Sequence, residues 1–303
     1  MLEKISLIAA IEAGGTKFNC AVGTSDGKLG VTERIATTTP EETMRGVLAF
    51  FERAEKEQGK IAAFGVGSFG PLDVHEDSST HGFITTTPKP GWQNADLLGP
   101  LKKRFDVPMG FDTDVNAAAL GEHMWGAGQG CDPLIYITIG TGIGGGALVN
   151  GKLLHGMLHP EMGHLLVTPP PSSAPNPACT CPFHVGCMEG YLCGPAIAKR
   201  WGAPAETFLP GHEMWREFAT TLASGLVNMI VTMSPRRIIL GGGVMHQEHL
   251  FPMIRAEVRR LLNGYLQTRE LLEDVDHYIV PPGLGDRAGM MGSLALGMRA
   301  LGV

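Results

Sequence analysis

Four short apolar segments of the sequence each end in a turn rich in glycine or acidic residues, and these turns restrict the fold more than any other feature. They occupy residues 12–17, 112–116, 140–146 and 241–243. Glycine at the end of a strand lets backbone N–H groups approach an anion without a Cβ in the way. One turn of this kind would indicate little, but four in this order predict phosphate binding.

The segments between the turns predict strands and helices in succession. Apolar runs predict strands at residues 5–11, 18–22, 62–67, 107–111, 134–139, 237–240 and 277–280. Periodic apolar residues and good helix formers predict helices at residues 40–58, 95–105, 117–125, 218–231, 251–262 and 289–301. Strands followed by helices occur once in each half, so we expect an α/β protein of two lobes with a ligand cleft between them.

Composition and charge favour a protein that acts on a small molecule. Hydrophobic residues make up 44% and charged residues 18%, which is typical of a globular protein. The net charge is -6 and no basic run occurs, so neither nucleic acid nor a membrane surface is expected as a partner. Residues 1–11 superficially resemble a signal peptide, but Glu12 and a glycine pair follow at once. We therefore predict a buried first strand and a cytoplasmic location.

The turn at residues 140–146 also matches a dinucleotide-binding pattern. Gly140, Gly142 and Gly145 give G-x-G-x-x-G, and Glu161 stands about where a ribose-binding acid would. That fingerprint must open a helix, whose N-terminus faces the pyrophosphate. Here residues 147–149 and 152–154 flank Asn150-Gly151 and predict a hairpin with a type I′ turn. An oxidoreductase is therefore disfavoured.

The cysteines indicate a metal site before a disulfide. Four of the six lie between residues 179 and 193, and a reducing cytosol keeps thiols free. Together with nearby histidines they offer one ligand more than tetrahedral zinc needs: His164, Cys179, Cys181, His184 and Cys187. The remaining histidines that we considered show no ligand spacing and are predicted to be ordinary surface or core residues: His155, His159, His212, His246, His249 and His277.

Several motifs, in order over nearly the whole chain, resemble the ROK family of repressors, open reading frames and sugar kinases. They are Glu12-Ala13-Gly14-Gly15-Thr16-Lys17, residues 112–122, residues 140–146, Glu161-Met162-Gly163-His164, residues 181–189 and residues 283–289. Glu12 and the wording Cys181-Pro182-Phe183-His184 are similar to the bacterial fructokinase branch. The resemblance implies an actin-like ATPase (ribonuclease-H-like) fold. We expect an N-terminal lobe at 1–118 with a closing helix at about 289–303, and a C-terminal lobe at 119–288 with a zinc loop at about 161–193.

The resemblance also implies roles for individual residues. Asp114 is the expected catalytic base, which takes the proton of the sugar hydroxyl, although an Asp here would also suit a helix cap. Glu12 is expected to hold Mg²⁺, directly or through water. The expected ATP-binding residues are Gly14, Gly15, Thr16, Lys17, Gly140, Thr141, Gly142, Gly241, Gly242, Gly243 and Gly285.

The sugar-binding residues that the resemblance implies are Gly70, Pro71, Thr113, Asp114, Glu161, His164 and Glu189. Thr113 stands where many glucokinases carry Asn, and Lys89 where several do, which disfavours glucose. The resemblance to the fructokinase branch implies fructose as the sugar. Relatives with the Cys-Pro-Phe-His motif of the fructokinase branch suggest His164, Cys181, His184 and Cys187 as the structural Zn²⁺ ligands. The wider family pattern would use Cys179 in place of His184.

The sequence thus predicts a kinase that makes a hexose 6-phosphate from Mg-ATP, with fructose as the expected sugar. A kinase for glucose, mannose or an N-acetylated hexosamine and a non-catalytic sugar sensor are the alternatives. The intact Asp114 and phosphate turns disfavour the sensor. The resemblance further implies a homodimer.

Overall fold

A computed structural model describes residues 6–303 of the chain, so the predicted start of the first strand at Ile5 lies outside the described residues. The chain divides into two compact units. Unit 1 comprises Met1–Gly126, Leu153–Pro160 and Arg287–Val303, and unit 2 comprises Ala127–Lys152 and Glu161–Asp286. The predicted lobe boundaries were 118/119 and 288/289. The excursion of Leu153–Pro160 into unit 1 had no counterpart in the prediction.

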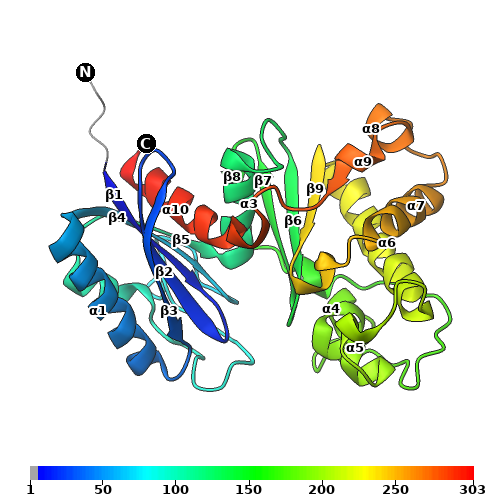
Figure 1. Cartoon of the computed structure of the whole chain (residues 1–303), viewed down its shortest axis with the longest axis horizontal. Helices are drawn as coiled ribbons and strands as arrows, with labels where there is room; N and C mark the ends of the chain where they lie inside the picture. The colour runs from blue at the N-terminus through cyan, green and yellow to red at the C-terminus, as the bar shows by residue number, and fades with distance from the viewer. Residues whose placement is uncertain (1–5) are drawn as a thin grey trace. The chain divides into compact units, whose positions relative to one another are not determined.

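Unit 1 is built on a mixed five-stranded sheet in the order β3-β2-β1-β4-β5 (Figure 1). Its strands are β1 (Leu7–Ala13), β2 (Lys17–Thr24), β3 (Leu29–Ala36), β4 (Ile61–Ser68) and β5 (Met109–Thr113). Its helices are α1 (Pro40–Gln58), α2 (Leu98–Arg104), α3 (Asp114–Trp125) and α10 (Ala288–Leu301). β1 pairs antiparallel with β2 and parallel with β4, and β4 pairs parallel with β5.

Strand β1 is apolar on both faces because helices cover the sheet on both sides. Ala9 and Ile11 belong to the core that includes α1, whereas Ile8 and Ala10 pack with residues of α10. Successive side chains of a strand point to opposite faces, so a strand buried on both sides is a continuous apolar run. The clear prediction of this strand from sequence follows from that double burial.

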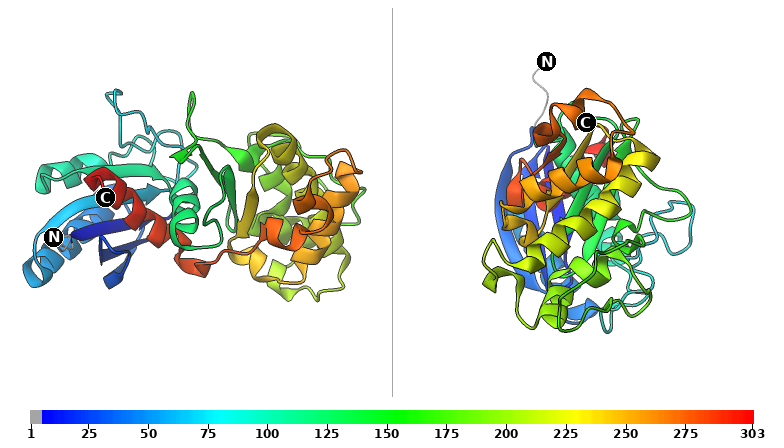
Figure 2. Two further views of the ribbon diagram at one scale, coloured as in Figure 1. Left: turned by 90° about the horizontal axis from the view of Figure 1, so that it is seen from above. Right: turned by 90° about the vertical axis from the view of Figure 1, so that its right-hand side faces the viewer.

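Glycines let α10 lie against α3 and β4 (Figure 2). A Cβ on Gly292 would lie 1.7 Å from the carbonyl oxygen of Ala117, and one on Gly65 would lie 1.8 Å from that of Ser293. Backbone contacts this close exclude any side chain at these positions. They hold the C-terminal helix in unit 1, with its first turn beside the end of β1.

Unit 2 is built on a second mixed five-stranded sheet in the order β10-β9-β6-β7-β8. Its strands are β6 (Leu134–Ile139), β7 (Ile143–Val149), β8 (Lys152–Leu153), β9 (Arg237–Gly241) and β10 (Ile279–Val280). Its helices are α4 (Met188–Leu192), α5 (Gly194–Trp201), α6 (Glu213–Met233), α7 (Leu250–Leu262), α8 (Arg269–Leu272) and α9 (Val275–Tyr278). The long helices α6 and α7 pack side by side (Figure 2).

Several sequence-based predictions of elements need correction, among them the helix α6, which begins at Glu213 rather than at residue 218. Residues 143–146 belong to β7 rather than to a turn, because they pair with β6. Of the strand predicted at 277–280, the first two residues belong to the helix α9 and the last two form β10. Helix α2 begins at Leu98 rather than at residue 95, and α3 already begins at Asp114. The hairpin is confirmed, because β7 and β8 flank Asn150 (φ 53°) and Gly151 (φ 72°), so residues 140–146 open no helix.

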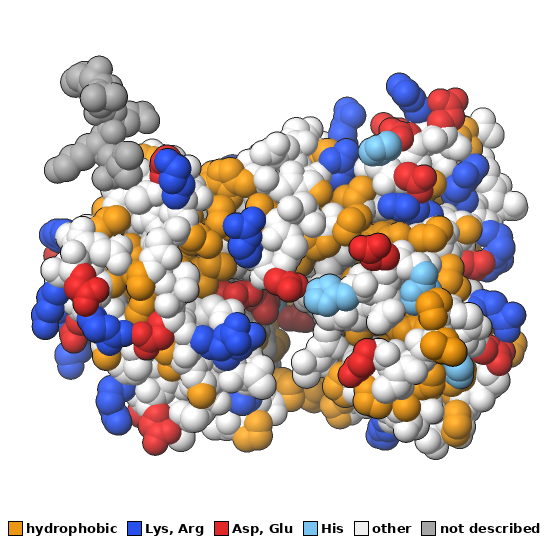
Figure 3. Space-filling model, viewed as in Figure 1, with side chains coloured by type: hydrophobic (Ala, Val, Ile, Leu, Met, Phe, Trp, Pro, Cys, Tyr) orange, Lys and Arg blue, Asp and Glu red, His pale blue; other side chains and the backbone are white. Residues whose placement is uncertain are grey.

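The surface agrees with the balance of charges in the sequence. On the face drawn in Figure 3, basic and acidic side chains are interspersed over both units. Within residues 6–303, no helix is both long and apolar enough to cross a bilayer.

Candidate functional site

The turn from β5 into α3 carries the predicted catalytic base. Thr113 is the N-cap of α3, and its Oγ1 accepts a hydrogen bond from the backbone N–H of Asn116 at 3.1 Å. Asp114 is the first residue of the helix and is half-buried. Thr113 is therefore the N-cap residue, and Oδ1 of Asp114 accepts a further hydrogen bond from Val115 N–H at 2.9 Å. The hydroxyl of Thr113 is engaged in this cap. A contact between Thr113 and the sugar stays a prediction.

Asp112 lies beneath this turn, 2% exposed, at the end of β5. Its Oδ1 accepts hydrogen bonds from the Thr113 N–H and the Asn116 Nδ2, both at 2.8 Å. Its Oδ2 pairs with Nε2 of His155 at 2.8 Å. This hydrogen bond raises the pKa of His155 above its usual range, against the effect of partial burial. A buried carboxylate with three donors forms a rigid support for the start of α3.

The predicted first phosphate turn is the hairpin between β1 and β2. The N–H of Gly14 donates to the carbonyl oxygen of Lys17 at 3.0 Å, which closes the turn. Gly15, Thr16 and Lys17 are exposed, and a Cβ on Gly15 would meet nothing within 4 Å. The tip of the hairpin is therefore accessible to a phosphate.

Glu12, the predicted Mg²⁺ residue, has protein neighbours of its own. Nδ2 of Asn19 donates to Glu12 Oε2 at 2.8 Å. A Cβ on Gly289 would lie 2.3 Å from Glu12 Oε1, so the carboxylate abuts the first turn of α10. The positive end of that helix favours a carboxylate there. The carboxylate is thus held in place by the protein and offers oxygen donors of the kind that Mg²⁺ prefers.

A pocket of about 380 Å³ opens in unit 2 between the two other glycine turns. It is lined by Gly140, Thr141, Gly194, Pro195, Pro204, Ala205, Glu206, Gly243, Val244 and Gln247. A Cβ on Gly140 or Gly243 would meet nothing within 4 Å, so these two glycines leave space open. Gly142, Gly241, Gly242 and Gly285 are not among the lining residues. The structure thus brings together two of the three predicted nucleotide-side turns.

Three of the predicted sugar-binding residues lie close together in unit 2. Glu189 is in the first turn of α4, where its Oε2 accepts a hydrogen bond from Ile143 N–H at 2.8 Å. Its Oε1 lies 4.0 Å from Nε2 of His164. Burial and the charge of Glu189 raise the pKa of Glu161 to about 7. Gly70, Pro71, Thr113 and Asp114 belong instead to unit 1.

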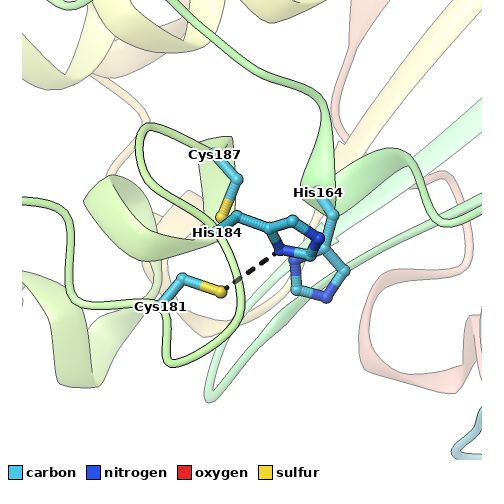
Figure 4. Close-up of side chains that lie close together, drawn as sticks. All are labelled: His164, Cys181, His184 and Cys187. Carbon is cyan, nitrogen blue, oxygen red and sulfur yellow. Dashed lines mark hydrogen bonds between the residues drawn. The ribbon is translucent and has the colours of Figure 1, made fainter.

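The predicted zinc ligands form a compact group in unit 2 (Figure 4). One ligand atom from each of His164, Cys181, His184 and Cys187 lies within 4.8 Å of the others. Nδ1 of His164 is buried and has no hydrogen-bond partner. Two thiols and two imidazoles are a donor set that zinc takes in structural sites, so the residues present fit the ion. Cys179 is not in this group. Its Sγ lies 3.5 Å from the carbonyl oxygen of His184.

Sequence reasoning missed some residues of the site. His155 and His159 were predicted to be ordinary, but His155 pairs with Asp112, and Nε2 of His159 accepts a hydrogen bond from Leu72 N–H at 3.0 Å. Both contacts join segments far apart in the sequence, so no local spacing signals them. Glu206 and Gln247 of the pocket were also missed, because neither belongs to a glycine turn.

Comparison with known proteins assigns the chain to a family. The model of the ROK family matches residues 8–300. The chain belongs to the ROK family. It is 44% identical over 297 residues to a fructokinase of Zymomonas mobilis, covering 97% of each chain. It is 42% identical over 295 residues to a fructokinase of Pediococcus pentosaceus, covering 97% of this chain and 99% of the relative.

Solved structures of this family share the fold. A ROK hexokinase from Thermus thermophilus has a TM-score of 0.77 at 27% identity, covering 96% of this chain and 97% of its own. A ROK glucokinase from Streptomyces griseus, in complex with glucose and AMPPNP, has a TM-score of 0.75 at 27% identity, covering 97% of this chain and all of its own. The predicted actin-like α/β fold is confirmed.

Proposed function

We propose that this ROK protein is an ATP-dependent hexose kinase that converts fructose to fructose 6-phosphate. Relatives called fructokinase are 42–44% identical over almost the whole chain, which supports the activity and the sugar together. The observation that carries the chemistry is the position of Asp114. It opens α3, while the neighbouring Thr113 supplies the helix cap. Oδ1 of Asp114 accepts a hydrogen bond from Val115 N–H at 2.9 Å, which fixes the carboxylate at the end of the strand, where it is suited to the role of a general base.

In the proposed reaction, Asp114 accepts the proton of the sugar hydroxyl as its oxygen bonds to the γ-phosphorus of ATP. The bond from that phosphorus to the β–γ bridging oxygen breaks, and ADP leaves. Catalysis of this kind rests on positioning and on neutralising charge. Backbone N–H groups of the exposed residues Gly15 and Thr16 and of the turn at Gly140 and Thr141 would bind phosphate oxygens. Mg²⁺ would neutralise phosphate charge, held by Glu12 directly or through water.

The pocket of unit 2 would receive the adenosine moiety. Gly140 and Gly243 leave its space open, and Glu206 and Gln247 supply polar groups at its wall. Glu161, His164 and Glu189 would contact the sugar hydroxyls. With a pKa of about 7, Glu161 could either donate to or accept from a hydroxyl near neutral pH.

The four-residue Cys/His group would hold a structural Zn²⁺ ion. The buried Nδ1 of His164 without a partner supports this, because a metal bond would satisfy it. The ion would fix the irregular segment between Glu161 and Glu189, so that both carboxylates face the sugar. Cys179 stands outside the group, which favours the set with His184.

The test is ADP release from Mg-ATP with fructose, glucose, mannose and N-acetylated hexosamines, with the Asp114→Ala variant in parallel. We expect turnover that is highest with fructose and is lost in the variant. Turnover with another hexose only would change the assigned sugar. A folded, zinc-loaded protein with no turnover on any sugar would support the sugar-sensor alternative instead.

A further inference from the structure

The segment Leu153–Pro160 belongs to unit 1, although the chain on both sides of it belongs to unit 2. It carries two histidines, one near each end, and each makes a contact with a different predicted part of the site. We propose that His155 and His159 are positioning residues. His155 orients the first turn of α3, which carries Asp114, and His159 orients the loop at Gly70 and Pro71 toward the sugar. The catalytic consequence rests on the proposed kinase function.

His155 acts on the first turn of α3 through a buried network. Its Nε2 pairs with Asp112 Oδ2 at 2.8 Å and lies 3.4 Å from Asn116 Nδ2. Asn116 is fully buried and follows Asp114 by two positions in the same helical turn. A buried carboxylate that loses one of its three donors must shift toward the remaining two. That shift would move the backbone that carries Asp114.

His159 acts on the sugar-side loop. It is 5% exposed, and its Nε2 accepts a hydrogen bond from Leu72 N–H at 3.0 Å. A Cβ on Gly70 would lie 3.4 Å from the same ring, so the imidazole also packs against the loop. Leu72 is fully buried, and its N–H has no access to water that could replace the imidazole. The ring must be neutral to accept this bond, and burial lowers the pKa of His159 accordingly.

The middle of the segment supports a positional role rather than a contribution to the core. Met157 is 97% exposed, so this part of the segment buries little apolar surface. Its carbonyl oxygen lies 3.2 Å from Nε2 of His75, which adds a third polar contact with unit 1. The segment is therefore held in place by polar contacts rather than by apolar packing. The residue that follows it in the chain is Glu161, one of the predicted sugar-binding residues.

The experiment compares Leu and Gln at both positions, because Gln can place an amide oxygen or N–H near the position of Nε2 and Leu cannot. We expect His159→Leu to raise the KM for the sugar roughly tenfold and to leave the KM for ATP unchanged, with most of the effect rescued by His159→Gln. We expect His155→Leu to lower kcat roughly tenfold with little change in either KM, again with rescue by Gln. His277→Leu, at a histidine 76% exposed in unit 2, is the matched control.

Amide hydrogen exchange gives a readout that does not depend on turnover. In His159→Leu the Leu72 amide should exchange at least about tenfold faster, and in His159→Gln it should keep its protection. A Leu72 amide that stays protected in His159→Leu would overturn the proposal. Equal rises in the KM for sugar and the KM for ATP in His159→Leu would also overturn it. The same holds if the Leu variants lose stability but keep the kinetic constants of the wild type. If the wild-type protein itself showed no turnover, the proposed function would fail, and the exchange experiment alone would decide the positioning role.

Discussion

In unit 1 the buried carboxylate of Asp112 receives three hydrogen bonds from the protein, whereas in unit 2 Nδ1 of His164 is buried with no hydrogen-bond partner. The first half of the candidate site lies where a strand passes into a helix. The second half is built on an irregular loop around a Cys/His group. The difference indicates that the half in unit 1 is preorganised by the chain alone, whereas the proposed Zn²⁺ ion would be needed to order the half in unit 2.

The largest expected effect is on turnover, at Asp114. Asp114→Asn should lower kcat by about 10²–10⁴-fold, because the amide cannot accept the proton of the sugar hydroxyl. Stability should change little, since Thr113 still caps α3 and the Asn amide oxygen can still accept from Val115 N–H. Thr113→Val, which removes the cap, is the matched control and should lower the free energy of unfolding by about 1 kcal/mol. A large loss of stability in Asp114→Asn would show that unit 1 does not have the self-sufficient support described above.

The second prediction concerns the metal that unit 2 is expected to need. Cys181→Ser should abolish stoichiometric zinc in elemental analysis, lower the melting temperature by roughly 5–10 °C and raise the KM for the sugar. Cys179→Ser, in the same loop but outside the ligand group, is the control and should keep its zinc. Zinc lost from Cys179→Ser as well as from Cys181→Ser would instead favour the ligand set of the wider family, in which Cys179 takes the place of His184. A zinc-free wild-type protein with full activity would remove the contrast between the two halves.

The third prediction separates two neighbouring glycines of one turn. Gly242 has φ of 87°, and a Cβ there would lie 2.5 Å from backbone atoms of Ile139, so Gly242→Ala should cost about 2–3 kcal/mol of stability. Gly243 faces the open pocket, so Gly243→Ala should instead raise the KM for ATP severalfold with almost no change in stability. Unfolding in denaturant and ATP titration of kinetics would measure both. Similar profiles for the two variants would contradict a nucleotide in this pocket.

What could be predicted from the sequence follows the same division. The buried strands and the turn at Asp114 have strong local sequence patterns. A strand buried on both faces is a continuous apolar run, and a strand-to-helix junction is marked by neighbouring turn and capping residues. Strand β3 was missed because nearly all of it is exposed, and it shows no apolar alternation. Helix α4 was also missed. It has only five residues, and its N-cap is Cys187, whose Sγ accepts a hydrogen bond from Gly190 N–H.

The residues that sequence reasoning could not assign act across long separations. His155 and His159 owe their contacts to a chain excursion that only the three-dimensional fold reveals, since Leu72 and His159 lie 87 positions apart. The Cys/His group could be predicted because Cys and His are rare and clustered. The set with His184, which the fructokinase resemblance favours, agrees with the group that the structure brings together, and Cys179 lies outside it.

The smallest expected effect is a difference in pH dependence between His155 and His159. The pKa of His155 is raised by its bond to Asp112, so the stability from this pair is fully present below about pH 6.5 and is lost as the pH rises through the raised value. The pKa of His159 is lowered, mainly by burial, so its contribution is present above about pH 6.5 and is lost as the pH falls through the lowered value.

Melting temperatures of the wild type, His155→Gln and His159→Gln between about pH 5 and pH 9 would measure both contributions. The gap between wild type and His155→Gln should be widest near pH 6 and shrink by about 2 °C toward pH 9. The gap between wild type and His159→Gln should be widest near pH 8 and shrink by a similar amount toward pH 5. Other titrating groups are shared by all three proteins, so their effects cancel in these gaps. Gaps that both stayed constant with pH would mean that neither imidazole has the protonation state that its contacts require, and the support of unit 1 would then rest on apolar packing.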